Sequence, residues 1–413
     1  MMLDKFILNQ IITHENIVTH FQPIVSIKDR TICGVEALTR GISNDNTLIP
    51  PSDLFETSEN LGLSAKLDNV CQKKALQKFY ECCNSSMLLF LNLDISQIDK
   101  GTLGVSNSIL SLASLLRVSA QYNIPHENIV IEILESKLEN TEKLIEIIEV
   151  YRSHGFLIAL DDFGIGHSNF DRMSILKPDI VKIDRSLITN IDKNSYKQEI
   201  FKSITGLARK IGALVIAEGV ETREETFKCI ELRADLLQGF YISKPGEKMC
   251  KTVLPFLNNL YLDFKCYLNE KLNTYKTKTD LIIAKTENII SSILMSDNIE
   301  NELEKIALNS DFMEAMYLLD MNGRQISFTH LSANTKPKLK SLLFSPSTID
   351  DDHSLKQYYY KIKTGETPFF ITEPYISRAT GNMCKTISSF LNGKSILCID
   401  IPVKHEYFEE FIN

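Results

Sequence analysis

Seven short runs rich in Val, Ile, Leu and Phe occur in the first part of the chain, and each carries a polar residue near its C-terminal end. The runs are ICGVEAL (32–38), LLFLNLD (88–94), IVIEILE (129–135), FLIALDD (156–162), DIVKID (179–184), LVIAEGV (214–220) and LLQGFY (236–241). Nearly continuous apolar runs predict strands that are buried on both faces. The polar residues that they carry are Glu36, Asn92, Glu132, Asp161, Lys182, Glu218 and Gln238.

Helical segments lie between most of these runs. We predict helices at 51–62, 64–82, 141–155, 195–212 and 222–232, several of which open with Ser, Thr or Asp and close with Gly. Strand and helix signals alternate over residues 19–245, about the length of a (β/α) barrel, roughly 200 to 250 residues. The pattern therefore predicts an α/β chain with a parallel TIM-like barrel, whose active site lies where the strands end.

The sequence changes character after Pro245. Residues 253–309 have a helical period, contain no glycine, and predict one long connecting helix or two. Strand signals return in EAMYLLDM, GRQISFTH, TPFFITEPYIS, CKTISSFL and SILCIDIPV, and Asn322 with Gly323 predicts a hairpin turn between the first two. With a helix predicted near 353–363, these segments indicate a small antiparallel α+β domain.

Length and composition limit the classes of protein to consider. A chain of 413 residues predicts two domains, which we place at 1–250 for the barrel and 310–413 for the C-terminal domain, with a helical linker at 251–309. The formal net charge of −8 argues against duplex nucleic acid as a partner. No run is long and apolar enough to span a membrane, and the N-terminus lacks a signal-peptide pattern. Nine cysteines without metal-site spacing indicate reduced thiols, so we expect a soluble, cytoplasmic protein.

Asp161 and Asp162 form the most informative pair, because two adjacent carboxylates follow an apolar strand and precede a flexible turn. A lone pair of this kind is more often a helix cap beside a solvated acid. The same holds elsewhere: Lys182 and Asp184 could form a simple ion pair, and Glu221 could cap the next helix. Convergence of several such residues on one face favours a functional site instead.

Carboxylates with one amide oxygen suit Mg²⁺ or Mn²⁺, since the set lacks the thiols and imidazoles that zinc prefers. Two such ions activate water and stabilise the leaving oxygen. A nearby lysine can orient the water, and a glutamate can accept its proton. The residues alone therefore predict metal-dependent phosphodiester hydrolysis.

Residues 19–245 resemble the EAL domain, the fold of bacterial cyclic di-GMP phosphodiesterases. The resemblance rests on Glu36-Ala37-Leu38 and on FQPIV (21–25), Arg40, LNL (91–93), EILE (132–135), DDFG (161–164), KID (182–184), AEGVET (217–222) and QGF (238–240). It implies hydrolysis of cyclic di-GMP to linear pGpG, with two Mg²⁺ or Mn²⁺ ions per site and inhibition by Ca²⁺.

The resemblance also assigns roles to residues. It makes Glu36, Asn92, Glu132, Asp161, Asp162 and Glu218 metal ligands. Lys182 would hold the hydrolytic water, and Glu36 and Glu218 join it as catalytic residues. Substrate contacts fall on Gln22, Arg40, Asp184, Glu221 and Gln238, and Glu135 would steady the loop that follows Asp162.

Departures from the family pattern lie at Leu134, Ile165 and His167, around that loop. The alternatives to an active enzyme are a cyclic di-GMP receptor with little or no turnover and a protein-interaction module. Because no metal ligand is lost, an active enzyme is favoured.

The C-terminal region resembles PAS-like or Cache-like sensory domains. That resemblance implies a small-molecule signal, with Tyr375, Ser377 and Arg378 as candidate pocket residues. A plain dimerisation module is the alternative. We expect a homodimer in which the C-terminal domain and the long helix set the position of the Asp162 loop.

Overall fold

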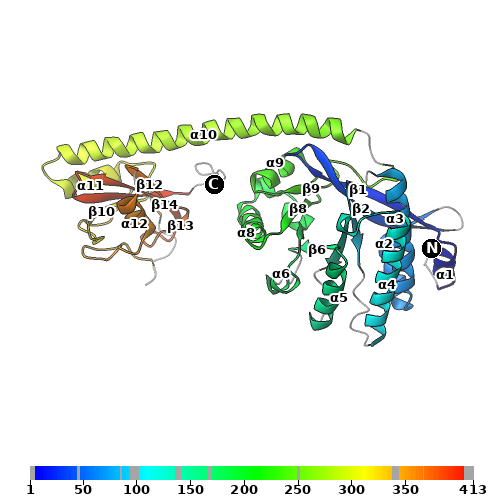
Figure 1. Cartoon of the computed structure of the whole chain (residues 1–413). Helices are drawn as coiled ribbons and strands as arrows, with labels where there is room; N and C mark the ends of the chain where they lie inside the picture. The colour runs from blue at the N-terminus through cyan, green and yellow to red at the C-terminus, as the bar shows by residue number, and fades with distance from the viewer. Residues whose placement is uncertain are drawn as a thin grey trace. The chain divides into compact units, whose positions relative to one another are not determined.

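A computed structural model describes residues 5–43, 47–83, 86–93, 102–134, 141–164, 170–248, 252–336, 344–365 and 367–403 (Figure 1). The chain divides into two compact units, one ending at Tyr267 and the other starting at Leu268. The boundary falls inside α10 (Val253–Met295), so this helix contributes residues to both units.

The N-terminal unit is built on a closed barrel of eight strands. Strand order is β1-β9-β8-β7-β6-β5-β4-β2, and a pairing between β1 and β2 closes the ring, with β3 (Leu48–Ile49) added at the outer end of β2. The barrel strands are β1 (Ile17–Ser26), β2 (Thr31–Ile42), β4 (Leu88–Asn92), β5 (Ile129–Leu134), β6 (Leu157–Phe163), β7 (Ile180–Ile183), β8 (Leu214–Glu218) and β9 (Leu236–Gln238).

The predicted TIM-like barrel is confirmed, with one correction to its strand directions. The seven apolar runs form β2 and β4 to β9, and neighbouring strands among β2, β4, β5, β6, β7, β8 and β9 pair in parallel. β1 is the eighth strand and runs antiparallel to both β2 and β9. The pattern did not single out β1 because a hairpin partner needs no intervening helix.

Helices cover the outside of the barrel. They are α1 (Lys5–Thr13), α2 (Pro51–Asn60), α3 (Ser64–Cys82), α4 (Thr102–Gln121), α5 (Thr141–Ser153), α6 (Phe170–Leu176), α7 (Arg185–Ile188), α8 (Ser195–Ile211) and α9 (Arg223–Glu231), with 3₁₀ turns η1 (His126–Asn128) and η3 (Ile191–Lys193). All five predicted helices are present, as α2, α3, α5, α8 and α9. Their inner faces and the outward side chains of the strands form the main apolar core.

Local sequence explains where α8 and α9 begin and end. Asn194 accepts a hydrogen bond from the amide of Lys197 at the start of α8, and Gly212 ends that helix in a left-handed conformation. α9 opens with a reciprocal capping box between Thr222 and Glu225. These caps fix the points at which the loops of the barrel mouth begin.

The C-terminal unit is an antiparallel sheet with helices on both faces. Strand order is β11-β10-β15-β14-β12, and β13 also pairs with β14. The elements are α11 (Ile299–Leu308), β10 (Ala315–Asp320), β11 (His330–Leu331), α12 (Gln357–Thr364), β12 (Phe369–Ile371), β13 (Tyr375–Ile376), β14 (Met383–Leu391) and β15 (Ser395–Pro402). The expected α+β domain is thus present, with the predicted hairpin between β10 and β11.

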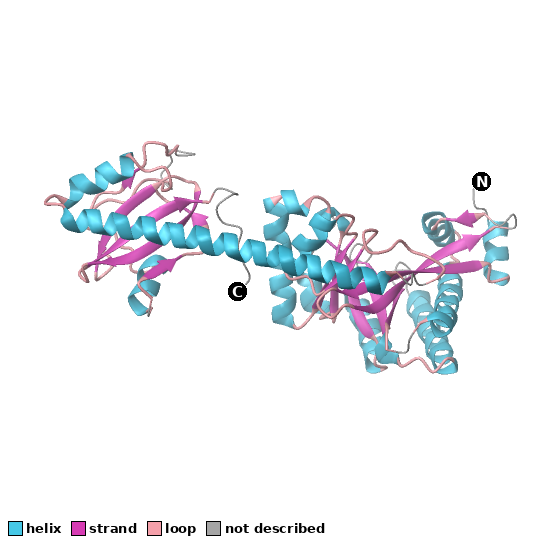
Figure 2. Cartoon of the chain, turned by 90° about the horizontal axis from the view of Figure 1, so that it is seen from above, coloured by secondary structure: helices cyan, strands magenta, loops and turns pink. Residues whose placement is uncertain are grey.

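Each face of this sheet has its own apolar cluster. The end of α10 and α11 pack on one face, through residues such as Ile289, Leu303 and Ile399. α12 packs on the other face, where Tyr317, Tyr358 and Cys398 meet. Figure 2 shows α10 passing across the strands of this unit.

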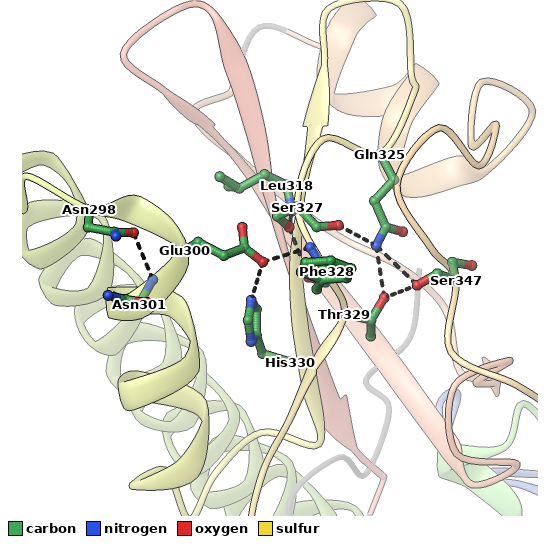
Figure 3. A network of polar contacts seen from close by, with 10 residues as sticks. All are labelled: Asn298, Glu300, Asn301, Leu318, Gln325, Ser327, Phe328, Thr329, His330 and Ser347. Carbon is green, nitrogen blue, oxygen red and sulfur yellow. Dashed lines mark hydrogen bonds and ion pairs between the residues drawn. The ribbon is translucent and has the colours of Figure 1, made fainter.

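A polar network joins α11 to the hairpin that follows β10 (Figure 3). Glu300 Oε1 accepts a hydrogen bond from the amide of Phe328 at 2.9 Å, and it also lies 2.9 Å from His330 Nε2. Gln325 Nε2 donates to the Ser327 carbonyl at 2.9 Å, deeper in the same turn. α11 is therefore fixed to the sheet by polar as well as apolar contacts.

The eight cysteines within the described ranges are all unbridged, which agrees with reduced thiols. Among the described helices, none combines the length and apolar content that crossing a bilayer requires.

Candidate active site

The polar residues predicted from the seven runs meet at one end of the barrel. On six strands, the polar residue lies two positions after an apolar residue that fills the barrel interior, as Glu132 follows Val130 and Lys182 follows Ile180. Because side chains alternate along a strand, the polar residue points to the same interior, one layer higher. On the antiparallel β1, Gln22 precedes Ile24 instead and lies opposite Glu36.

Lys182 lies at the centre of this group and is fully buried. Its Nζ is 2.7 Å from Glu132 Oε1, 3.1 Å from Asp161 Oδ1, 3.3 Å from Glu36 Oε2 and 3.4 Å from Glu218 Oε2. Five strands, β2, β5, β6, β7 and β8, contribute these side chains. One ammonium therefore contacts four carboxylates that lie far apart in the sequence.

Neutral amides hold two of these carboxylates in place. Gln238 Nε2 donates to Glu36 Oε2 at 2.5 Å and to Gln22 Oε1 at 3.2 Å. Asn92 Nδ2 donates to Glu132 Oε2 at 3.1 Å. Since Asn92 uses its NH₂ group in this contact, its amide oxygen stays available as a ligand.

Asp162 faces the site because the strand is irregular at this point. The register between β6 and β7 shifts between Leu160 and Phe163, and Asp162 has a left-handed φ of 56°. In a regular strand, adjacent side chains point to opposite faces, whereas a bulge re-aims one of them. Ligand oxygens of Asp161, Asp162 and Glu218 consequently all lie within 4.8 Å of one another.

Burial shifts the protonation of the cluster. It raises the pKa of Glu132 well above its usual value, with the Glu36 charge adding to the effect. Burial raises the pKa of Glu218 to about 8, although the Lys182 charge opposes this shift. It also raises the pKa of Asp162 to about 6. Burial alone would lower the pKa of Lys182, but the surrounding carboxylates, Asp161 first, raise it well above its usual value.

The donor set fits divalent cations that prefer oxygen. Five carboxyl groups, those of Glu36, Glu132, Asp161, Asp162 and Glu218, surround one lysine, so their charge exceeds what the ammonium balances. Apart from the ion pair with Lys182, the inner oxygens of Glu132, Asp161 and Glu218 accept no hydrogen bond from the described residues. Unsatisfied carboxylate oxygens at this spacing are suited to Mg²⁺ or Mn²⁺.

The remaining predicted residues surround this centre. Arg40 is half-buried, and its guanidinium donates to the Thr39 carbonyl at 2.7 Å. Asp184 is the N-cap of α7, where it accepts from the amide of Ser186 at 2.6 Å, and no Lys182–Asp184 ion pair occurs between these two described residues. Glu221 accepts from Arg185 at 3.0 Å. Thr222, and not Glu221, caps α9.

Three residues that the sequence singled out lie outside the described residues. They are Glu135, Ile165 and His167. Leu134, the other departure from the family pattern, is half-buried at the end of β5 and pairs in register with Asp161.

Sequence reasoning overlooked two residues that shape the mouth of the barrel. Glu225 accepts from the amides of Asn190 at 2.8 Å, Glu221 at 3.0 Å and Thr222 at 3.2 Å, so it joins the loops after β7 and β8. Arg185 joins the same loops through Glu221. The Thr-x-x-Glu spacing of a capping box at 222–225 would have identified Glu225.

The EAL domain family matches residues 7–245 of the chain. The chain is 24% identical over 409 residues to the uncharacterized EAL-domain containing protein YkuI of Bacillus subtilis, covering 96% of this chain and 97% of YkuI. The crystal structure of YkuI with substrate c-di-GMP and calcium superposes with a TM-score of 0.80 at 25% identity, over 98% of this chain and 100% of that one.

Several relatives carry names that describe an activity, and two of them show how far the match extends. Cyclic di-GMP phosphodiesterase PdeA of Borreliella burgdorferi is 32% identical over 227 residues, which are 55% of this chain and 33% of PdeA. The probable cyclic di-GMP phosphodiesterase PdeG of Escherichia coli is 28% identical over 247 residues, which are 58% of this chain and 46% of PdeG. The match therefore extends along nearly all of YkuI but less than half of PdeA and PdeG.

Proposed function

Since this chain belongs to the EAL domain family, we propose that it is a cyclic di-GMP phosphodiesterase that hydrolyses one phosphodiester bond of its substrate to give linear pGpG. The observation that carries the proposal is the cluster of five carboxyl groups around the buried Lys182 at the barrel mouth. Members of the family include phosphodiesterases of this specificity, and the related YkuI binds c-di-GMP.

The carboxylates divide into two sets. Glu36, Asn92, Glu132 and Asp161 would hold one Mg²⁺ or Mn²⁺ ion, and Asp161, Asp162 and Glu218 a second. When bound, such ions lower the pKa of water and neutralise charge on the phosphodiester. Ca²⁺, which takes longer and less regular oxygen contacts, would bind without supporting turnover.

Lys182 and Glu218 have roles that follow from their positions. With its pKa raised, Lys182 keeps its ammonium charged at neutral pH, and Nζ can donate a hydrogen bond to the attacking water. Glu218, half-buried at the end of β8, would accept the proton of that water. Gln238 keeps Glu36 oriented while this happens.

The substrate would lie over the mouth formed by the loops and by the rim of β1 and β2. Arg40 would pair with a phosphate, for which a guanidinium is well shaped. Gln22 and Gln238 would contact the substrate close to the cluster. Asp184 and Glu221, at the ends of β7 and β8, would accept hydrogen bonds from it.

We assign the other parts of the chain to regulation. Residues 1–250 would be the phosphodiesterase, 251–309 the helical linker, and 310–413 a PAS/Cache-like sensory or dimerisation domain that responds to a small molecule. An antiparallel sheet with helices on both faces supports this assignment. The active form would be a homodimer, with Glu135 supporting the loop after Asp162.

The test is hydrolysis of c-di-GMP by the purified chain, with pGpG followed by chromatography. We expect product with Mg²⁺ or Mn²⁺ and none with Ca²⁺. Glu36→Gln should abolish the activity, because it removes a carboxylate held between Lys182 and Gln238. Glu199→Gln is the matched control, since Glu199 is exposed on α8.

Absence of product with every metal, but saturable binding of c-di-GMP, would replace the proposal by the receptor alternative. Absence of both would favour an interaction module. Dimerisation is tested separately by sedimentation, and a monomer at micromolar concentration would refute the dimeric part of the proposal.

A further inference from the structure

The face of the C-terminal sheet that carries α12 contains a buried carboxylate, Asp400. On one rung of the sheet, Asp400 of β15 is paired with Ala315 of β10 and Thr386 of β14. Only 3% of Asp400 is exposed. Its oxygens accept hydrogen bonds from Thr386 Oγ1 at 2.7 Å, Ser377 Oγ at 3.2 Å and Tyr375 OH at 3.5 Å.

Among the described residues, no side chain forms an ion pair with Asp400. A second buried carboxylate, Glu314, lies next to it in the sheet, because the Glu314 amide donates to the Asp400 carbonyl. Glu314 accepts hydrogen bonds from two neutral groups of the described residues, Thr380 Oγ1 and Asn382 Nδ2, both at 2.9 Å. Within the described ranges, the ion pairs of this unit involve neither carboxylate. A buried anion without a counterion is costly, and a cation would relieve that cost.

Aromatic rings gather on the same face of the sheet. The ring of Tyr358 lies 6.1 Å from that of Tyr317 and 6.3 Å from that of Tyr375. Burial raises the pKa of all three tyrosine hydroxyls, and the charge of Asp400 adds to this effect. Aromatic faces attract organic cations, especially where water is excluded.

His353 belongs to the same aromatic group. His353 is buried, its Nδ1 lies 2.7 Å from Tyr358 OH, and its ring lies 5.4 Å from the ring of Tyr317. Its Nε2 has no hydrogen-bond partner among the described residues. Buried polar atoms are normally satisfied, so His353 Nε2 has the capacity to form a hydrogen bond with a molecule bound beside the tyrosines.

A short segment that includes β13 contacts the Asp400 carboxylate through Tyr375 and Ser377. β13 pairs with β14 through only two residues, Tyr375 and Ile376. Tyr375 is half-buried and Ile376 is exposed, while Ser377 is buried against Asp400. A small molecule would reach the carboxylate beneath this segment.

We infer that the C-terminal unit binds a small organic cation, with its ammonium group against Asp400 and its body among Tyr317, Tyr358 and Tyr375. The inference builds on the proposed sensory role of this unit and gives its signal a chemical class. Inorganic divalent ions fit less well, because they need a shell of about six to eight oxygen ligands, whereas aromatic rings lie beside Asp400. Simple amines and amino acids share the ammonium group that Asp400 would recognise.

The test is isothermal titration calorimetry on the full chain without c-di-GMP. The probes are choline, ethanolamine and glycine, each added alone. Dimethylbutanol, the neutral carbon isostere of choline, is the matched ligand control. Asp400→Asn removes the charge and keeps the shape, and Asp297→Asn, at an exposed position, makes the same charge change elsewhere in the unit.

We expect at least one cation to bind, the isostere not to bind, and Asp400→Asn to weaken binding by about tenfold or more, with Asp297→Asn unchanged. A response to glycine identifies amino acids as ligands, and a response confined to choline or ethanolamine identifies simple amines. If Asp400→Asn does not fold, Tyr375→Leu removes one of the three rings at a half-buried position, and it should weaken the binding of any cation that the wild-type chain binds.

No binding of any cation at about 10 mM would overturn the inference, because that concentration detects even weak, millimolar ligands. Equal binding of choline and its isostere, or equal binding by the Asp400→Asn and wild-type chains, would do so too. Hydrolysis by the barrel is not measured in this experiment. Its outcome therefore leaves the proposed phosphodiesterase activity open to its own test.

Discussion

Replacing Lys182 by methionine tests the central feature of the barrel. Methionine keeps most of the length of the side chain but removes the ammonium that contacts four carboxylates at 2.7 to 3.4 Å. Lys182 is fully buried, so water does not take over the lost contacts. The substitution leaves the acidic cluster without its only cation from a described side chain.

The expected loss of stability is about 3 to 5 kcal/mol, the usual cost of removing one partner of a buried ion pair. The way in which this loss of stability depends on pH follows from the groups whose pKa values are shifted. Because the pKa of Lys182 is raised, its contribution is fully present below the usual pKa of lysine and is lost only at more alkaline pH. In the variant, protonation of carboxyls such as Glu132 relieves the repulsion, so the loss should be smaller at pH 5 than at pH 8.

The measurement is urea unfolding followed by far-ultraviolet circular dichroism, with a chelator present. Hydrolysis of c-di-GMP is measured in parallel with Mg²⁺ or Mn²⁺ at a temperature where the variant stays folded. If Lys182 holds the attacking water, its loss should lower kcat by about a hundredfold to ten-thousandfold.

Lys228 provides a matched control. It is also a buried lysine, with Nζ 3.1 Å from the buried Glu231, but it lies on α9 outside the cluster. Lys228→Met should lower stability while the folded enzyme keeps its kcat. Equal loss of kcat in both variants would refute the catalytic reasoning, and a stability loss for Lys182→Met that grows toward acid pH would refute the electrostatic reasoning.

Three further predictions concern substitutions elsewhere in the chain. Burial raises the pKa of Asp400 to about 6. Its protonation should therefore stabilise the C-terminal unit by about 1 kcal/mol as the pH falls from 7 to 5, and Asp400→Asn should remove this gain in urea titrations. Gly34→Ala should lower the free energy of unfolding by about 1 to 3 kcal/mol, because the added Cβ would lie 2.9 Å from the Phe90 ring. Gly206→Ala is the control: its Cβ would meet no atom within 4 Å, so the free energy of unfolding should be unchanged or higher. Asp162→Val should lower the melting temperature more than Asp162→Asn, since a β-branched residue resists a φ of 56°, and both should impair hydrolysis.

The order of strands and helices in the barrel was predictable because it depends on local pattern. Apolar runs of strand length, separated by capped amphipathic segments, identified seven barrel strands and the five helices that were predicted. β1 was not assigned as a strand, because its role depends on two neighbours, β2 and β9, that it meets in space. The extent of α10 was also only partly evident, since an uninterrupted helical period predicts one helix or two equally well.

The composition of the site was predictable, but several of its contacts were not. The position of each polar residue near the end of a strand indicated that Glu36, Glu132, Asp161 and Glu218 would meet. The sequence suggested Asp184 as a partner of Lys182, whereas in the fold Lys182 contacts carboxylates from four other strands and Asp184 caps α7. Ion pairs between distant strands depend on the register around the closed barrel, which no local pattern records.

The amino-acid sequence by itself determined the α/β class, the helices of the linker, the hairpin at Asn322-Gly323 and the membership of the acidic cluster, since spacing and residue type specify these features. Only the tertiary structure decided how β1 closes the barrel, how a bulge turns Asp162 toward Asp161 and Glu218, and that Asp400 is buried with no counterion among the described residues. These features arise where segments distant in the chain exclude water from one another, and the cost of burying charge depends on which neighbours the fold supplies.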